Sequence, residues 1–252
     1  MTGFLIDLDG VLRRGTCLIE GAAELLHALN TFPYLVVTNN STRTAEEYAE
    51  NLRSMGLPIA PQHILTSAQA TAMFLKSNRP YSTAWVVGER GLHSEINKIG
   101  YEISETCECV VAGWDRTLTF QKLETACLAI RNGAEFIGTN PDLTYPSEKG
   151  IIPGCGAILA FLEACTGQKP LIIGKPSRLI MEIALESLQD TDVYVIGDRL
   201  DTDIQAGINA GLKTVLVLTG IETKKSLSAS SIHPTHVFED LETLTDFITT
   251  LQ

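Results

Sequence analysis

The sequence lacks several features that would each point to a particular class of protein. No apolar run approaches the ~20 residues that a membrane-spanning helix needs. Lys and Arg together number 19 against 30 Asp and Glu, and the resulting net charge of −11 argues against nucleic acid or an anionic membrane as a partner. None of the six cysteines forms a Cys-x-x-Cys pair, so a zinc site is not indicated, and free thiols in a reducing cytoplasm are expected.

What the sequence does contain is a regular alternation of apolar segments. With 252 residues, 44% of them hydrophobic, the chain is long enough for one large domain or two small ones. Runs such as Tyr34–Val37 and Val193–Ile196 are apolar throughout, which suits strands buried on both faces of a parallel sheet. Helical patterns separate these runs, so the fold class expected is α/β with right-handed crossovers.

The expected elements follow from these patterns. Strands are predicted over Phe4–Ile6, Tyr34–Val37, Trp85–Val87, Cys109–Ala112, Glu135–Gly138, Leu171–Ile173, Val193–Ile196, Thr214–Leu218 and Val237–Phe238. Helices are predicted over Glu20–Asn30, Thr44–Gly56, Ser67–Ser77, Leu92–Ile99, Phe120–Asn132 and Gly154–Thr166, and then from Ser177, up to Gly211 and from Asp240. The stretches Thr139–Gly156 and Lys224–Ser231 are rich in polar and turn residues and are expected to be loops.

Polar side chains follow four of the predicted strands at the point where each strand ends. These clusters are Asp7 with Asp9, Thr38 with Asn39, Lys175, and Asp198. In parallel sheets, ligands bind beyond the carboxyl ends of the strands, so we expect the four clusters to meet at one edge. Four strand ends with complementary chemistry are more specific than any one motif.

The pair Asp7 and Asp9 is the most informative of these clusters. Two carboxylates two residues apart project from the same side of an extended chain, which is unfavourable unless a cation lies between them. Gly10 then allows a sharp turn. We interpret Asp7 as a nucleophile, Asp9 as a proton donor, and Mg²⁺ as the bridging ion. The alternative is that an acidic pair in this loop only caps the next helix.

The other three clusters complement this hypothesis. A threonine hydroxyl at Thr38 and the backbone amide of Asn39 suit phosphoryl oxygens, and Lys175 suits the charge of a phosphoryl group. Asp198 would complete the metal site with Asp7. Each residue also has a plainer interpretation, since Thr38, Asn39 and Asp198 could cap helices and Lys175 could lie on the surface.

Further charged residues near these clusters leave their roles open. Asp203 could orient Lys175 or a metal-bound water, whereas Asp201 is expected to be a solvated acid in the first turn of a helix. Arg13, Arg14 and Arg43 are expected on the solvated surface, with guidance of an anion as the alternative.

The four clusters, in this order, resemble the haloacid dehalogenase superfamily of Mg²⁺-dependent phosphatases. The segments that carry the resemblance are Asp7–Leu12, Thr38–Asn40, Gly174–Pro176 and Gly197–Ile204. The last of these, together with the long insert between Thr38 and Lys175, resembles the NagD-type branch, which also contains phosphoglycolate and 4-nitrophenyl phosphate phosphatases. Within the insert, the segments that agree with that branch are Val87–Glu89, Gly133–Ile137, Thr139–Asp142 and Pro153–Ala157.

This resemblance implies a domain organisation and a set of site residues. Residues 1–79 and 169–252 would form a Rossmann-like parallel-sheet catalytic core, and 80–168 an inserted α/β cap domain of the C2 type. The nucleophile would be Asp7 and the general acid/base Asp9. Mg²⁺ would be held by the Asp7 carboxylate, the Asp9 backbone carbonyl and Asp198, and phosphate by Thr38, Asn39 and Lys175.

The function implied is hydrolysis of small phosphomonoesters through an aspartyl-phosphate on Asp7. Nucleoside monophosphates, phosphoglycolate, sugar phosphates and pyridoxal phosphate are the substrates that the family suggests. The expected partner is a small phosphorylated metabolite rather than nucleic acid or membrane, the expected location is cytoplasmic, and the cap is a candidate surface for a homo-oligomer.

Two other classes remain alternatives. A receiver-like signalling domain also accepts phosphate on an aspartate, but it lacks a general acid two residues further on and would not turn over. A dinucleotide-binding module would need a Gly-x-Gly-x-x-Gly motif after the first strand, and none is present there.

Overall fold

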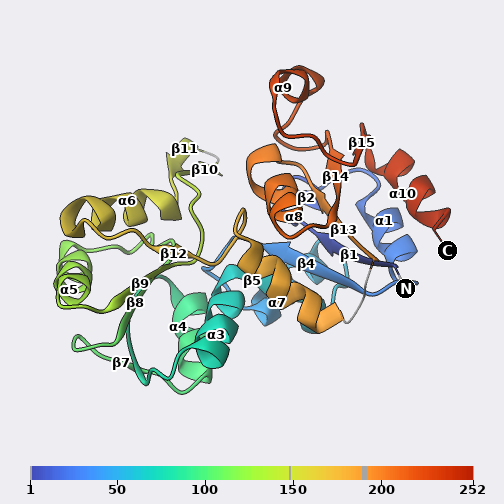
Figure 1. The fold of residues 1–252 in the computed structure, drawn as a ribbon. Helices are drawn as coiled ribbons and strands as arrows, with labels where there is room; N and C mark the ends of the chain where they lie inside the picture. Colours follow the sequence, from blue (N-terminus) through green and yellow to red (C-terminus); the bar gives the residue numbers. More distant parts are fainter. Residues whose placement is uncertain (1, 148, 189–191, 252) are drawn as a thin grey trace. The chain divides into compact units, whose positions relative to one another are not determined.

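The computed structural model describes residues 2–147, 149–188 and 192–251, which form two compact units (Figure 1). The first unit comprises Met1–Thr38, Ala45–Leu65 and Lys175–Gln252, and the second comprises Asn39–Thr44 and Thr66–Gly174. Among the described residues, no helix has both the length and the apolar character needed to cross a bilayer.

The first unit is built on a six-stranded sheet. Its strands, in their order across the sheet, are β15 (His236–Phe238), β14 (Lys213–Val217), β13 (Asp192–Gly197), β1 (Thr2–Ile6), β4 (Tyr34–Thr38) and β5 (Ile64–Thr66). The pairs from β15 to β4 are parallel. Ile6 of β1 lies opposite Ile196 of β13 on one side and Val36 of β4 on the other. The α/β fold class with a parallel sheet is therefore confirmed.

Helices cover both faces of this sheet because its strands are apolar on both sides. Phe4 and Ile6 pack into a core with α1 (Ala22–Leu29), α2 (Ala45–Ser54) and α10 (Leu241–Thr249). The alternate residue Leu5 lies with Met181 of α7 (Arg178–Leu188), as the period of two in a strand requires. The remaining elements of this unit are the strands β2 (Arg13–Arg14) and β3 (Cys17–Leu18), the 3₁₀ turn η1 (Pro61–His63), the π-helical turn η2 (Leu200–Ile204), and the helices α8 (Gln205–Asn209) and α9 (Lys224–Ala229).

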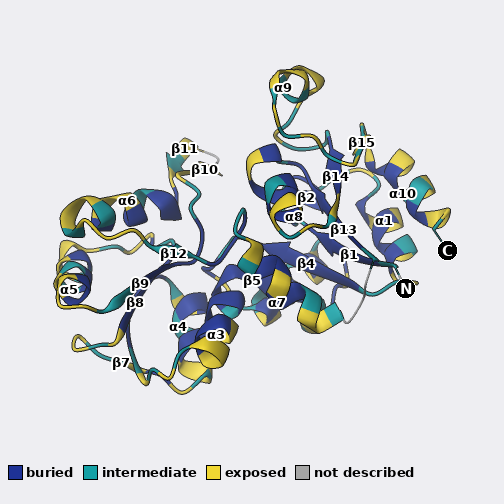
Figure 2. Cartoon of the chain, viewed as in Figure 1, coloured by how far each residue is buried: buried dark blue, intermediate teal, exposed yellow. Residues whose placement is uncertain are grey.

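The second unit has its own parallel sheet of five strands. Across the sheet these are β12 (Leu171–Ile172), β9 (Glu135–Gly138), β8 (Cys109–Ala112), β6 (Thr83–Val87) and β7 (Glu102–Ile103). Its helices are α3 (Ser67–Asn78), α4 (Arg90–Lys98), α5 (Phe120–Arg131) and α6 (Cys155–Thr166). Figure 2 shows the central strands of each sheet as buried, with exposed residues gathered on the outer sides of the helices.

The division of the chain differs from the range 80–168 predicted for the inserted domain. Helix α3 belongs to the second unit, where the Tyr101 hydroxyl hydrogen-bonds the carbonyl of Leu75 and Arg79, just past α3, forms an ion pair with Glu135. At the other end, β12 pairs with β9 of the second sheet, although the sequence pattern suggested a strand of the core. Residues 169–174 therefore fall outside the first unit.

Two stretches predicted as loops are regular structure. Within Thr139–Gly156, the strands β10 (Thr144–Ser147) and β11 (Gly150–Pro153) form an antiparallel hairpin. Trp114 holds this hairpin, since its indole donates to the carbonyl of Pro153 over 3.0 Å and its ring lies 4.5 Å from that of Tyr145. Within Lys224–Ser231, helix α9 forms behind a capping box made by Thr223 and Ser226.

Candidate active site

Three neighbouring strands of the first unit carry predicted site residues to one edge of the sheet. Asp7 follows β1, Asp198 follows β13, and Thr38 ends β4. The backbone amide of Asp7 continues the ladder by donating to the carbonyl of Ile196 over 2.8 Å. Because these strands are parallel, their carboxyl ends emerge together, and the predicted convergence of Asp7, Thr38 and Asp198 follows from the register.

Close approach at this edge depends on glycine. Gly10 adopts φ +98°, and a Cβ there would overlap the carboxylate of Asp198. A Cβ at Gly220 would overlap the same carboxylate. The Asp198 carboxylate therefore occupies space that is open only because positions 10 and 220 are glycine. Its Oδ2 accepts a hydrogen bond from the backbone amide of Ile221 over 2.7 Å.

Lys175 reaches the same edge by an unexpected route. It follows β12, which lies in the second sheet, so the prediction that it ends a strand of the first sheet was wrong. Its ammonium is nevertheless buried in the first unit, where it pairs with Asp7 Oδ1 and with Asp203 Oδ1, the latter over 2.6 Å. It also donates to the carbonyl of Val37 over 2.9 Å. The side chains of Lys175 and Asp203 are each 3% exposed and that of Asp7 is 12% exposed.

Burial and crowding shift the protonation of these groups. Burial raises the pKa of Asp7 well above its usual range; Lys175 opposes this shift, and Asp203 and Asp198 add to it. Burial, followed by the charge of Asp203, raises the pKa of Asp198 to about 7. Burial alone would lower the pKa of Lys175, but Asp203 and Asp7 reverse the shift and raise it, so the ammonium stays charged.

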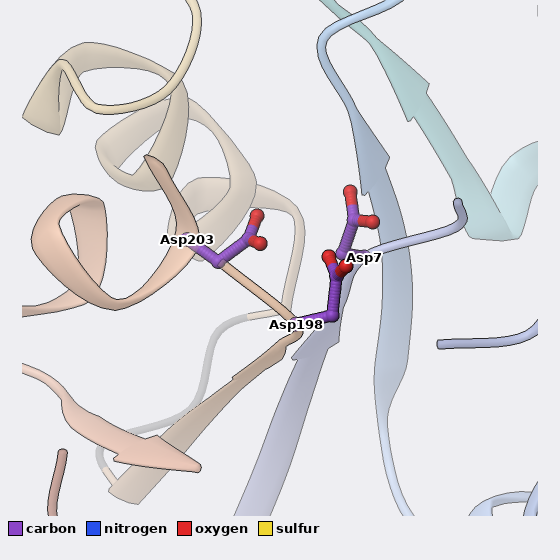
Figure 3. A group of neighbouring side chains, drawn as sticks. All are labelled: Asp7, Asp198 and Asp203. Atoms are coloured by element: carbon purple, nitrogen blue, oxygen red, sulfur yellow. The ribbon is translucent and has the colours of Figure 1, made fainter. Parts of the chain in front are cut away.

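Three carboxylates at this edge face one another. Asp7, Asp198 and Asp203 each offer an oxygen atom, and these atoms lie within 4.8 Å of one another (Figure 3). Asp198 Oδ1 is buried and has no hydrogen-bond partner among the described residues. A buried carboxylate oxygen without a partner costs free energy unless a cation occupies its free side. Oxygen donors of this kind suit a hard divalent cation such as Mg²⁺, so the residues present fit the predicted metal.

Asp203 is the member of this cluster that sequence reasoning did not place there. It was expected to orient either Lys175 or a metal-bound water, and its ion pair with Lys175 agrees with the first of these roles. Its second oxygen accepts from the backbone amide of Arg199 over 3.2 Å, which fixes it inside the turn η2. The five-residue spacing from Asp198 was visible in the sequence, but the π-helical turn that brings the two together was not. Asp201 is 66% exposed, as a solvated acid should be.

The Asp9 carboxylate lies outside the cluster and binds Arg13 instead. Arg13 Nε donates to Asp9 Oδ1 over 3.0 Å. Arg13 is only 7% exposed, so the expectation of a solvated surface residue was wrong for it, because Asp9 and Asn51 satisfy its guanidinium inside the unit. Arg14 and Arg43 are exposed, as predicted.

Asn39 belongs to the second unit by its contacts. Its side-chain amide donates to Asp142 Oδ2 over 3.0 Å, and its carbonyl accepts from the Ser67 hydroxyl over 2.6 Å and from Asn140 Nδ2 over 2.8 Å. The preceding residue, Thr38, is 3% exposed and belongs to the first unit. The predicted roles of Thr38 and Asn39 toward phosphate stay predictions.

A parallel sheet whose carboxyl edge carries converging carboxylates and a buried lysine is typical of α/β enzymes that act on anionic substrates. Comparison with known families and proteins agrees with this class. Residues 4–102 match the family described as haloacid dehalogenase-like hydrolase, and residues 172–244 match a second family described as HAD-hydrolase-like. The chain is 42% identical over 245 residues to the acid sugar phosphatase of Staphylococcus haemolyticus, covering 95% of this chain and 93% of that protein.

Solved structures resemble the whole chain. A hypothetical protein from Pyrococcus horikoshii superimposes with a TM-score of 0.96 at 38% identity, over 98% of this chain and all of the other. The 4-nitrophenylphosphatase from Thermotoga maritima gives 0.93 at 34% identity, over 97% and 96% of the two chains. NagD from E. coli gives 0.89 at 34% identity, over 95% and 96%.

The chain therefore belongs to the haloacid dehalogenase-like hydrolases. The resemblance to the NagD-like branch and the assignment as a phosphatase are confirmed at the level of the family.

The space at Gly220 provides a test of the metal site. Replacing Gly220 by Ala should displace the Asp198 carboxylate and weaken Mg²⁺ binding, which isothermal titration calorimetry can measure. Gly15→Ala is the control for an added methyl group that contacts nothing, since no atom lies within 4 Å of its added Cβ, although its φ of +59° adds backbone strain that Gly220 does not have. Equal Mg²⁺ affinity in both variants would contradict the argument.

The raised pKa of Asp198 predicts how Mg²⁺ binding depends on pH. Its ordinary value is 3.8 and its folded value is about 7, so the folded carboxyl keeps a proton that the unfolded chain releases. Without metal, this group's contribution to stability is full below roughly pH 4 and is lost as the pH rises toward about 7. Mg²⁺ needs the ionised carboxylate, so its stabilising effect should grow over the same range.

Thermal unfolding with and without Mg²⁺ at pH 5 to 8 measures this effect. The rise in Tm caused by Mg²⁺ should be larger at pH 7.5 than at pH 5, and Asp198→Asn should remove most of the difference. A Tm rise that is the same at both pH values would contradict the prediction.

Proposed function

We propose that this phosphatase hydrolyses small phosphomonoesters with the help of Mg²⁺, through an aspartyl-phosphate on Asp7. The observation that carries the proposal is the position of Lys175, whose buried ammonium lies against Asp7 and Asp203 beside the unpartnered oxygen of Asp198. Such an arrangement supplies a carboxylate nucleophile, a fixed positive charge and a place for a divalent ion at one point. Phosphoryl transfer depends on positioning and charge neutralisation of this kind.

Asp7 is the proposed nucleophile, and Lys175 keeps it usable. Burial favours the protonated form of Asp7, which cannot attack phosphorus, and the ammonium of Lys175 works against that shift. In the first half of the reaction, an Asp7 oxygen forms a bond to phosphorus while the bond between phosphorus and the substrate oxygen breaks. This divides one difficult displacement into two easier ones.

Asp9 is the proposed general acid and base. It donates its proton to the departing substrate oxygen, which leaves as an alcohol. In the second half it takes a proton from water as the water oxygen attacks phosphorus, so that phosphate leaves and the Asp7 carboxylate is restored. Asp9 ends the cycle protonated and ready for the next substrate.

The phosphoryl oxygens need donors and positive charge around them. Thr38 would donate through its hydroxyl and Asn39 through its backbone amide, while Lys175 offsets the charge as a point cation. Mg²⁺, held by the Asp7 carboxylate, the Asp9 backbone carbonyl and Asp198, would supply further charge neutralisation. Asp203 holds Lys175 in place from the other side.

Hydrolysis is preferred over a receiver-like switch because Asp9 provides proton transfer for both halves of the reaction. The relatives also point to substrates, being named acid sugar phosphatase and 4-nitrophenylphosphatase. We therefore propose sugar phosphates as the first class to test, ahead of nucleoside monophosphates and phosphoglycolate. A cytoplasmic location and a homo-oligomer formed through the second unit stay predictions.

The function is tested by a panel of phosphomonoesters. Phosphate release should be measured with Mg²⁺ over sugar phosphates, nucleoside monophosphates, phosphoglycolate, pyridoxal phosphate and 4-nitrophenyl phosphate, ranked by kcat/KM. Repeated turnover that EDTA abolishes and Mg²⁺ restores is expected. Incorporation of a single phosphate without turnover would favour the receiver-like alternative.

Asp7→Asn tests the nucleophile. The variant should fold, because Lys175 keeps its ion pair with Asp203, but it should show no detectable turnover and no acid-stable labelling by a substrate with radioactive phosphorus. The thermal midpoint and circular dichroism serve as controls for folding. Turnover at the wild-type rate would remove Asp7 from its role.

A further inference from the structure

Arg13 is a buried arginine next to the proposed general acid. It is 7% exposed, and a buried guanidinium is costly unless its donors are satisfied. Its Nε donates to Asp9 Oδ1 over 3.0 Å and its Nη1 donates to Asn51 Oδ1 over 2.8 Å. The guanidinium also lies over the ring of Tyr48, 5.5 Å from its centre. These three contacts, with Asp9, Asn51 and Tyr48, therefore hold the guanidinium of Arg13 in one orientation.

The backbone holds both members of the pair as well. Gly10 donates to the carbonyl of Arg13 over 2.7 Å, and Arg13 donates to the carbonyl of Leu8 over 3.2 Å. Arg13 then pairs with Leu18 across the hairpin of β2 and β3. The loop between Asp9 and Arg13 is thus closed on itself, and the two side chains meet without either main chain having to move.

Asp9 has no comparable anchor of its own. Its side chain is 38% exposed, and Oδ1 is bound by Arg13. Its other oxygen, Oδ2, makes no hydrogen bond within residues 2–147, 149–188 and 192–251. An exposed aspartate ordinarily samples several rotamers, so its orientation here depends on the anchored arginine.

We propose that Arg13 is a positioning residue for Asp9, binding Oδ1 so that Oδ2 is presented for proton transfer. This inference rests on the proposed function, in which Asp9 moves the proton. General acid–base catalysis contributes ~10²- to 10⁴-fold, and a displacement of about 1 Å can cost ~10²-fold. A loosened Asp9 should therefore lose part of that factor while substrate binding is kept.

Arg13→Met tests the proposal, because methionine keeps apolar contact with Tyr48 and removes both hydrogen bonds. We expect kcat on the best substrate of the panel to fall by about 10-fold with KM changed less than about 2-fold. Arg13→Lys should fall between Arg13→Met and the wild type. The matched control is Arg14→Ala, an exposed neighbour on the same hairpin, with kcat expected to stay unchanged.

A double-mutant cycle with Asp9→Asn separates positioning from a structural role. If Arg13 acts through Asp9, adding Arg13→Met to Asp9→Asn should change kcat by less than about 2-fold. An equal loss in both backgrounds would show a structural role and overturn the inference, as would a wild-type kcat in Arg13→Met alone.

A second variant keeps the test valid if Arg13→Met fails to fold. Asn51→Ala removes one anchor of the guanidinium and leaves the arginine in place. It should give a smaller loss of kcat that also disappears with Asp9→Asn, and no loss would overturn the inference.

The proposed function fails in a different way. A wild-type protein without turnover, or an Asp9→Asn variant as fast as the wild type, would remove the function and the inference together. A normal loss in Asp9→Asn beside a fully active Arg13→Met would remove the inference alone.

Discussion

The ammonium of Lys175, buried between Asp7 and Asp203, is the interaction on which the rest of the site depends. Three carboxylates crowd this edge of the sheet, and burial alone would push Asp7 toward its protonated form. A charged lysine within hydrogen-bond reach makes the crowding tolerable and opposes the rise in the pKa of Asp7. A buried ion pair is a weak source of stability, so we expect the placement of Lys175 to serve the proposed chemistry rather than the stability of the fold.

The sheet brings together the carboxylates that surround Lys175. Parallel order across β13, β1 and β4 brings the ends of separate chain segments to one edge, and the amide of Ile221 holds Asp198 from the far side. Glycine at positions 10 and 220 leaves the volume that the Asp198 carboxylate occupies. The backbone therefore mainly sets where the carboxylates of this edge lie, and side-chain contacts add to it.

Much of this could be predicted from the sequence because it depends on local pattern. Apolar runs such as Val193–Ile196 fix where strands lie, and the polar residues after them mark the edge. The strand-end pattern placed Lys175 at this edge for the wrong reason, because β12 is two residues long and pairs with a strand of the second sheet more than 30 residues earlier. The burial of Arg13 was missed for a related reason: its partner Asn51 comes from α2, far along the chain. Lys224–Ser231 is mostly polar, yet it contains a helix that begins behind a capping box and whose Leu227 packs against a small apolar cluster.

The second unit is not one continuous stretch, and this bears on how the family could exchange parts in evolution. Besides 66–174 it contains the short segment 39–44, tied to it by the amide of Gly91, which donates to the carbonyl of Thr42 over 3.0 Å. A recombination event that replaced only 66–174 would place the original segment 39–44 against a domain taken from another protein. Chimaeras between relatives should therefore transfer both pieces together, and natural exchange of this domain alone requires three coordinated crossovers on its amino-terminal side, at 38/39, 44/45 and 65/66, rather than one.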